Sequence, residues 1–417
     1  MSAAPARPPR FRWVVCGLLF LVTANNYVDR QALGVLAPAL IDELGWTAGD
    51  YADLVFWFQV GFAIGFPLTG RFLDAVGTRW GFAFAVAVWS LASAAHGLVS
   101  TLLAFKAARF VLGLSQPSNM PAGVKVVAEW FPPREQALAT GLFKGGANLG
   151  SILVPLVVPA LFFATGWRAT LLILAATGFV WLAFWLWLYR PPAAGEAEAA
   201  PVPGRVRWRV LLRRRETWAY MTVKFLTDAV WHWYVAMLPL FLAQRFGLSL
   251  REFGLPLVAV YAIASVGSVG GGWLSSHWIA RGWDLTRARK LAMLLCCLCT
   301  VPVLGVTRSD SLWLCVVLIG LAMAAHQGLT SNLFTAVSDL FPPQAVGTVV
   351  GLGGSAAQLG AALMTLLTGA VLDDGGHLTE LFLIAGAVYV VAFAVFHVLV
   401  PRLVRLELPV LTRRATV

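Results

Sequence analysis

The sequence predicts an all-α membrane protein with twelve transmembrane helices in two pseudo-symmetric bundles of six. The first observation behind this prediction is composition: 59% of the 417 residues are hydrophobic, 12% are charged, and the mean hydropathy is +0.77. A soluble protein carries about 25% charged residues. Apolar runs close to the ~20 residues that cross a bilayer recur along the chain. Helices, rather than the strands of a barrel, fit runs of this length.

The second observation is an internal repeat, in which one passage occurs twice with a constant separation of 210 residues. The copies read Phe131-Pro132-Pro133, Gly141-Leu142, Ala147-Asn148-Leu149-Gly150 and Phe341-Pro342-Pro343, Gly351-Leu352, Ala357-Gln358-Leu359-Gly360. A repeat this long in a hydrophobic chain predicts two homologous helix bundles with a binding site between them, near the bilayer midplane. Such an arrangement is typical of a transporter.

The apolar runs, taken in order, predict about twelve spans separated by short polar loops. Their expected ranges are 13–39, 52–73, 80–98, 102–124, 135–163, 168–189, 217–244, 252–274, 290–307, 311–337, 345–371 and 380–401. The bundles then occupy 13–190 and 216–401, between an N-terminal tail (1–12), a linker (191–215) and a C-terminal tail (402–417). The linker is rich in Pro, Ala and Glu and then in Arg, and we expect it to be mobile.

Basic and acidic residues divide between alternate loops. Because cytoplasmic loops collect Lys and Arg, both termini are expected in the cytoplasm. The expected location is the bacterial inner membrane, with several spans crossing it. The net charge of +11 belongs to these loops, and the chain has no nucleic-acid-binding motif. The five cysteines fall in apolar spans, where they act as small buried hydrophobes, so no metal site is expected.

Two other classes of membrane protein fit the sequence less well. A polytopic membrane enzyme would need an array of catalytic carboxylates or histidines near one interface, and the loops contain none. A sensor or scaffold would be expected to add a soluble domain, and the linker is too short for one. We therefore expect that the protein is not an enzyme. We also expect no cofactor other than protons as a coupling ion, and a monomer in the lipid bilayer.

A glycine-bounded motif lies between the second and third spans. It reads Gly70-Arg71-Phe72-Leu73-Asp74-Ala75-Val76-Gly77-Thr78-Arg79. The glycines permit a tight turn, and Asp74 can cap a helix end or pair with an arginine across the bundle. Gly70, Asp74, Gly77 and Arg79 are therefore expected to have gating or structural roles. Ser276 stands at the place of Asp74 in the second half, so that copy is degenerate.

This motif, the twelve spans and the central linker resemble the major facilitator superfamily, and more narrowly the hexuronate transporters of its anion:cation symporter branch. The residues that carry the narrower resemblance are Asn26-Tyr27-Val28-Asp29-Arg30-Gln31-Ala32-Leu33, Asn119-Met120-Pro121-Ala122, Ala128-Glu129-Trp130-Phe131-Pro132, Lys224-Phe225-Leu226-Thr227-Asp228, His326-Gln327-Gly328 and Asn332-Leu333-Phe334-Thr335. The resemblance implies proton-coupled uptake of a small organic anion by alternating access, with glucuronate or galacturonate as the expected substrate.

Ionisable residues inside a bilayer are functional candidates by default. Arg30 in the first span offers a planar fork for a substrate carboxylate, with Tyr27 on the same helical face. Asp29 is a candidate for proton coupling. Arg109 and Gln116, two turns apart in the fourth span, complete the charged set.

Gln116 departs from the family that the chain resembles, where a Glu is usual at this position. Glutamine has the shape of a protonated Glu but does not titrate. Three possibilities stay open: Asp29 couples alone, the protein is a passive facilitator, or the glutamine is an engineered mimic of the protonated state.

The second half offers further polar residues. Lys224 and Asp228 share a helical face and either neutralise each other or contact substrate hydroxyls, with Trp231 and Tyr234 nearby as aromatic faces for a sugar ring. Candidates for contacts with substrate hydroxyls are His326, Gln327, Asn332 and the repeat partners Asn148 and Gln358. Another carboxylate, such as an aldonate, a dicarboxylate or an aromatic acid, is the alternative substrate.

Overall fold

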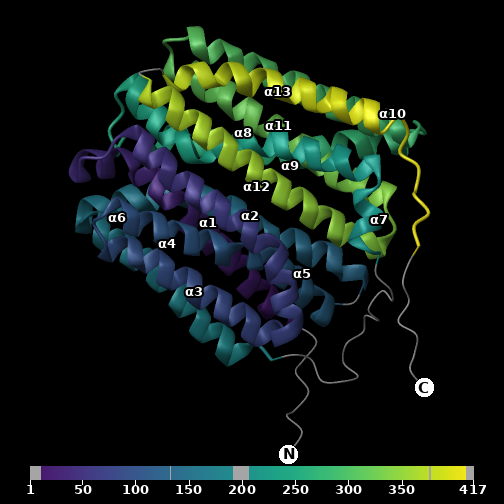
Figure 1. The fold of residues 1–417 in the computed structure, drawn as a ribbon, viewed down its shortest axis with the longest axis horizontal. Helices are drawn as coiled ribbons and strands as arrows, with labels where there is room; N and C mark the ends of the chain where they lie inside the picture. Colours follow the sequence, from purple (N-terminus) through teal and green to yellow (C-terminus); the bar gives the residue numbers. More distant parts are fainter. Residues whose placement is uncertain (1–10, 132, 191–205, 375–376, 410–417) are drawn as a thin grey trace, which may run out of the picture.

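The computed structural model describes residues 11–131, 133–190, 206–374 and 377–409, and this part of the chain is helical and contains no strand. The expected tail before Phe11, linker residues 191–205 and the end of the C-terminal tail lie outside these ranges. The helices, labelled as in Figure 1, are α1 (Phe11–Leu44), α2 (Ala48–Val76), α3 (Thr78–Leu98), α4 (Leu102–Ser115), η1 (Gln116–Ser118), α5 (Asn119–Trp130), α6 (Pro133–Leu188), α7 (Trp208–Leu212), α8 (Arg215–Phe246), α9 (Gly254–Ala280), α10 (Leu285–Thr300), η2 (Val301–Arg308), α11 (Leu312–Leu340), α12 (Pro343–Asp373) and α13 (Leu378–Leu399).

Helix α6 contains two of the expected spans. A straight helix of its 56 residues would be about 84 Å long at 1.5 Å per residue, well over the ~30 Å of a bilayer core. The chain reverses at Gly166, whose φ of 79° is a conformation that glycine adopts without a steric penalty. The Tyr189 ring then lies tilted against Trp130, with the ring centroids 6.2 Å apart. Trp130 lies just before α6 in the sequence, so both ends of α6 lie at one end of the bundle.

The fourth span is broken rather than continuous. Pro117 lacks a backbone donor, and the chain forms the short 3-10 helix η1 between α4 and α5. The span continues to Trp130, beyond its expected end at 124. In the described chain, ten segments are long and apolar enough to cross a membrane, with Ala139–Leu188 counted once. Dividing that segment at Gly166 and adding α4–η1–α5 yields the expected twelve.

The helices form two bundles that lie side by side in Figure 1, with α1 to α6 in purple to blue and α8 to α13 in teal to yellow. In the first bundle α1 packs on α6 and α2 on α4, and in the second α9 packs on α11 and α8 on α12. The bundles meet where α2 contacts α12, α1 contacts α8 and α6 contacts α9. The predicted fold class is confirmed.

Glycines allow the closest of these approaches. A side chain on Gly146 or Gly150 of α6 would collide with the backbone of α1, at the carbonyl oxygens of Phe20 and Ala24 respectively. In α12, a side chain on Gly353 would meet the Tyr220 ring. Small residues are what let membrane helices pack backbone to backbone.

The two ends of the bundles differ in charge, as the loop pattern predicts. At the end called here the basic end, Arg12 pairs with Glu135 at 2.8 Å and Arg289 pairs with Asp339 at 3.3 Å. Asp339 is the repeat partner of Glu129, which accepts hydrogen bonds from Thr78 and Tyr189 at the same end of the first bundle. The opposite end, called the acidic end, includes Glu43, which accepts a hydrogen bond from the Trp167 indole at 2.8 Å.

The glycine-bounded motif forms the turn between α2 and α3 at the basic end. Gly77 has a φ of 86° and separates the two helices, while Arg79 donates to the Leu186 carbonyl at 2.6 Å. The side chain of Asp74 and the environment of Gly70 lie outside the described part of α2, so their roles stay predictions.

The glycine contacts lead to a paired test. Gly146→Ala should destabilise the protein by about 1–3 kcal/mol, because the added methyl group overpacks the α1–α6 contact. Gly141→Ala is the matched control in the same helix, where nothing lies within 4 Å of the added carbon. Thermal unfolding of both variants in detergent measures the difference. Equal unfolding temperatures for the two variants would contradict the role of Gly146 in close packing.

Candidate functional site

The side chain of Arg30 lies near the middle of α1 among three aromatic rings. Its guanidinium carbon is 5.2 Å from the centroid of Tyr27, 5.4 Å from Phe58 and 4.6 Å from Phe62. Aromatic faces attract a cation by about 0.5–2 kcal/mol each, but they do not neutralise its charge. The sequence places Tyr27 on the same face of the first helix as Arg30, and the two phenylalanines come from α2.

Arg30 and Arg109, which lies on α4, form no ion pair within the described residues. Buried nitrogens of Arg30 and Arg109, the Nε atoms, have no hydrogen-bond partner there. The guanidinium carbon of Arg109 lies 5.8 Å from the centroid of the same Phe58 ring. The charges of Asp29 and Arg30 act on Arg109 electrostatically. Two guanidinium groups with unused donors inside a membrane bundle have the chemistry that suits an anion.

A small cavity between the two bundles opens onto these arginines. It is lined by α1, α2 and α4 on one side and by α8 on the other, through Arg30, Gly34, Tyr51, Val55, Phe58, Gln59, Arg109, His232, Val235 and Ala236. Its volume of about 30 Å³ exceeds the ~10–15 Å³ that one water needs, but it is far too small for a sugar acid. The site is therefore closed around its cations in this conformation.

Contacts across the cavity show what closes it. The Tyr51 hydroxyl of α2 donates to the Ala236 carbonyl of α8 at 2.9 Å. Gly34 of α1 faces the same carbonyl, with 3.3 Å between that oxygen and a side-chain carbon built on the glycine. The buried Gln59 lines the cavity, and its Oε1 accepts no hydrogen bond from the described residues. A ligand hydroxyl would satisfy it.

Asp29 and Gln116 point into the first bundle rather than into the cavity. Asp29 is buried and accepts hydrogen bonds from Ser93 at 3.0 Å and Asn25 at 3.2 Å. The Gln116 amide donates to the Asn26 carbonyl at 3.3 Å, and its own Oε1 has no partner in the described chain. Asp29 thus has hydrogen bonds and no cation within ion-pair distance among the described residues.

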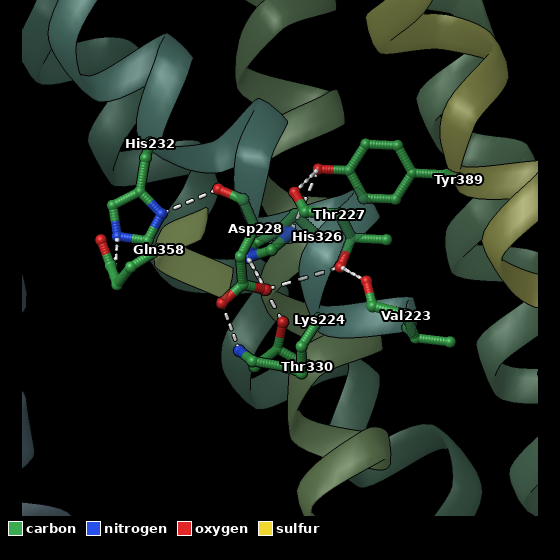
Figure 2. A network of polar contacts seen from close by, with 9 residues as sticks. All are labelled: Val223, Lys224, Thr227, Asp228, His232, His326, Thr330, Gln358 and Tyr389. Carbon is green, nitrogen blue, oxygen red and sulfur yellow. Dashed lines mark hydrogen bonds and ion pairs between the residues drawn. The ribbon is translucent and has the colours of Figure 1, made fainter. Parts of the chain in front are cut away.

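The second bundle holds a polar network, shown in Figure 2. Lys224 and Asp228, one turn apart on α8, form a buried ion pair, with only 7% and 9% of their side chains exposed. His326 of α11 lies 3.9 Å from the Asp228 carboxylate. Its other ring nitrogen meets the Tyr389 hydroxyl at 3.1 Å. These charges are largely compensated, in contrast to those at Arg30.

One residue connects this network with the cavity. His232 lines the cavity, and its ring lies 3.2 Å from the amide nitrogen of Gln358 on α12. Figure 2 shows the two side chains facing each other. Trp231 stacks on His326 with the ring centroids 4.9 Å apart, inside the second bundle.

The remaining predicted site residues lie at separate places in the structure. Asn332 is fully buried and donates to the Gly271 carbonyl at 2.7 Å, which joins α11 to α9. Tyr234 is buried beside Phe382, while Asn148 is exposed and Gln327 half-buried. None of these four lines the cavity, and their predicted roles remain untested.

Sequence reasoning missed the contribution of α2 and the place of His232 at the cavity. Tyr51, Phe58, Gln59 and Phe62 supply most of the surroundings of Arg30. Gln59 could have been found, because it is the polar residue in the apolar run Val55–Phe62. The aromatics could not, because they look like ordinary membrane residues.

A larger hollow of about 540 Å³ lies at the acidic end, between the start of α2 and the ends of α8 and α12. Its lining includes Asp373 and His377 and, among the described residues, contains no arginine or lysine. It suits an entrance to the interface better than an anion site.

Comparisons with known proteins agree with this geometry. A family model described as Major Facilitator Superfamily matches residues 19–335 and 284–415. The chain is 27% identical to the hexuronate transporter of Escherichia coli strain K12 over 384 residues, which cover 88% of each protein. It is 28% identical to the galacturonate transporter of Dickeya chrysanthemi, over 63% of this chain and 81% of that protein. The D-galactonate transporter of Escherichia coli O6:H1 is 24% identical, over 93% and 96%.

The solved structures show the same fold. A bacterial homologue of the human lysosomal transporter Spinster, crystallised in an inward-facing and occupied conformation, superposes with a TM-score of 0.77. The match covers 95% of this chain and 97% of that one at 17% sequence identity.

The Lys224–Asp228 pair leads to a stability test. Lys224→Met should cost about 3–5 kcal/mol, because it leaves the Asp228 charge buried without its partner. Lys224→Met combined with Asp228→Leu should recover most of that loss, since both charges are removed. Thermal unfolding of the purified variants measures both. A double variant as unstable as the single one would show that the pair is not coupled in the way the geometry indicates.

Proposed function

Because the chain belongs to the Major Facilitator Superfamily, we propose that it is a secondary transporter of a small sugar acid, with a hexuronate such as glucuronate or galacturonate as its substrate. The observation that carries the proposal is the guanidinium of Arg30 at the cavity between the bundles, which forms no ion pair with the described residues. The similarity to hexuronate and galacturonate transporters supports the choice of substrate class.

Arg30 and Arg109 bind the carboxylate. A planar guanidinium donates two parallel hydrogen bonds to a carboxylate, and both arginines have donors to spare. The amide of Gln59 and the imidazole of His232, both at the cavity, bind sugar hydroxyls. The rings of Phe58 and Tyr51 supply apolar surface for the sugar ring.

Transport proceeds by alternating access, in which the two bundles rock about the site. The cavity of about 30 Å³ has to widen before a sugar acid enters, so contacts such as Tyr51 to Ala236 break during the cycle. Arg-rich loops lie at the basic end, and the positive-inside rule puts that end and both termini in the cytoplasm.

The coupling ion in this proposal is a proton carried by Asp29. An isolated carboxylate in a bilayer avoids its desolvation cost by taking up a proton, whereas Asp228 is already neutralised by Lys224. Asp29 has Ser93 and Asn25 as hydrogen-bond partners, and Arg109 is the cation that acts on it. Gln116 has no proton to exchange.

Two alternatives remain within the transporter class. An uncoupled facilitator would use the same cations without Asp29 titrating. A different carboxylate, such as an aldonate, would bind the same arginines, and the similarity to a D-galactonate transporter favours this one over an aromatic acid.

Uptake into proteoliposomes tests the substrate. Labelled glucuronate and galacturonate should enter, and glucose should not, because it lacks the carboxylate that Arg30 binds. Arg30→Gln should lower glucuronate uptake by about 100-fold, corresponding to the loss of ~2–3 kcal/mol of charge-assisted hydrogen bonding. Arg209→Gln is the control, since Arg209 is exposed on the short helix α7. Equal uptake of glucose, or unchanged uptake by Arg30→Gln, would overturn the proposal.

A second assay tests the coupling. An inward proton gradient should drive accumulation of glucuronate by the wild-type chain, and Asp29→Asn should abolish accumulation but retain exchange. Asp53→Asn is the control, because Asp53 pairs with Lys106 at a half-exposed position. If only Gln116→Glu accumulates substrate, the proton site belongs at position 116 and the present chain is uncoupled.

A further inference from the structure

A second pair of cations meets between the bundles, away from the arginines. Lys144 of α6 and Lys224 of α8 place their ammonium nitrogens 5.4 Å and 5.2 Å from the centroid of the same Phe334 ring, on α11. The first bundle supplies Lys144 and the second supplies the other two residues. The three side chains thus form a contact across the interface.

The charges of this cluster are not balanced. Lys144 forms no ion pair within the described residues, and Lys224 repels it electrostatically. Asp228 is the carboxylate near them, and it is already paired with Lys224. One positive charge is therefore left over. Burying a lysine in a membrane span without a counter-charge costs free energy, so such a residue is a candidate for a functional role.

Lys144 is accessible, in contrast to its neighbour. The Lys144 residue is exposed while Lys224 is buried, so the Lys144 side of the cluster is the more open one. Tyr220 packs against Phe334 with the ring centroids 6.4 Å apart, and its buried hydroxyl has no hydrogen-bond partner in the described part of the chain. The cluster therefore offers an ammonium group, an apolar ring and an unused hydroxyl.

The cluster lies between the cavity and the basic end. Lys224 precedes His232, which lines the cavity, by eight residues on α8, or about 12 Å at 1.5 Å per residue. Helix α8 begins at Arg215, at the basic end, so Lys224 is on the side of the cavity that faces this end. Lys144 follows the start of α6 at the same end.

We propose that Lys144 and Lys224 form a second binding site for the carboxylate of the transported acid, on the path between the central cavity and the basic end. This inference rests on the proposed function for the identity of the ligand. The carboxylate binds Lys144 and competes with Asp228 for Lys224, and the Phe334 ring contacts the apolar face of the sugar.

Such a site makes it easier for the anion to leave the central arginines. An anion leaving two arginines loses strong hydrogen bonds, and a nearby site of weaker cations divides that loss into two smaller steps. Lysine is suited to the second step because a hydrated ammonium holds a carboxylate less rigidly than a guanidinium does.

Equilibrium binding of labelled glucuronate to the purified full chain tests the proposal. The wild type should bind in two phases: a tight one that Arg30→Gln removes and one with a Kd at least about tenfold higher that Lys144→Gln removes. Lys144→Arg should retain the weaker phase, because it keeps the charge. Arg209→Gln should retain both phases. Thermal unfolding of each variant checks that it is folded.

The outcomes separate the two proposals. A single phase, lost with Arg30→Gln and unaffected by Lys144→Gln, overturns the second site and leaves the transport proposal standing. Binding that depends on Lys144, in a protein that transports no sugar acid, supports the second site and overturns the proposed function. Absence of any glucuronate binding overturns both.

Discussion

The guanidinium of Arg30, held inside the bundle without a carboxylate partner among the described residues, is the constraint on which the rest of the site depends. Desolvating such a charge costs several kcal/mol even after relaxation. Three aromatic rings at 4.6–5.4 Å offset part of that cost, at about 0.5–2 kcal/mol each. The part of the desolvation cost that the rings do not offset favours the binding of an anion. Moving α1 against α2 would separate Arg30 from Phe58 and Phe62, so the proposed rocking motion keeps these two helices together.

The two bundles contribute unequally to the charges at the site, although the internal repeat relates their sequences. The first bundle supplies Arg30 and Arg109, whose donors are unused within the described chain. In the second bundle, Lys224, Asp228 and His326 satisfy one another, so it presents a nearly neutral surface to the site. In the proposed mechanism the anion is therefore recognised mainly by the first bundle, and α8 of the second bundle closes over it.

Much of the fold was predictable, because composition and a repeat are properties of long segments that single residues do not disturb. The reversal at Gly166 falls in the predicted loop between the spans 135–163 and 168–189, while the fourth span is broken at Pro117 and continues beyond its expected end. Arg30 was predictable because a charge in an apolar run is conspicuous. Asp29 next to it was harder to place, since adjacent helical residues point about 100° apart. It faces Ser93 in the bundle interior, and Arg30 faces the cavity.

The surroundings of Arg30 could not be predicted in the same way. Phe58 and Phe62 belong to α2, and an apolar periodicity does not say which aromatic will face a cation on another helix. The symmetry of the repeat was also a poor guide to side chains. His326 matches Gln116 in position, but it packs with Tyr389 and Trp231 inside its own bundle.

The most direct test of anion recognition by Arg30 compares a charged ligand with its neutral counterpart. The affinity of the purified protein would be measured for glucuronate and for glucuronamide, in which an amide replaces the carboxylate, with wild-type and Arg30→Gln chains. We expect the wild type to prefer the acid by at least about tenfold and Arg30→Gln to lose this preference. Equal affinity of the wild type for both ligands would show that the guanidinium of Arg30 is not what the site uses to recognise its substrate.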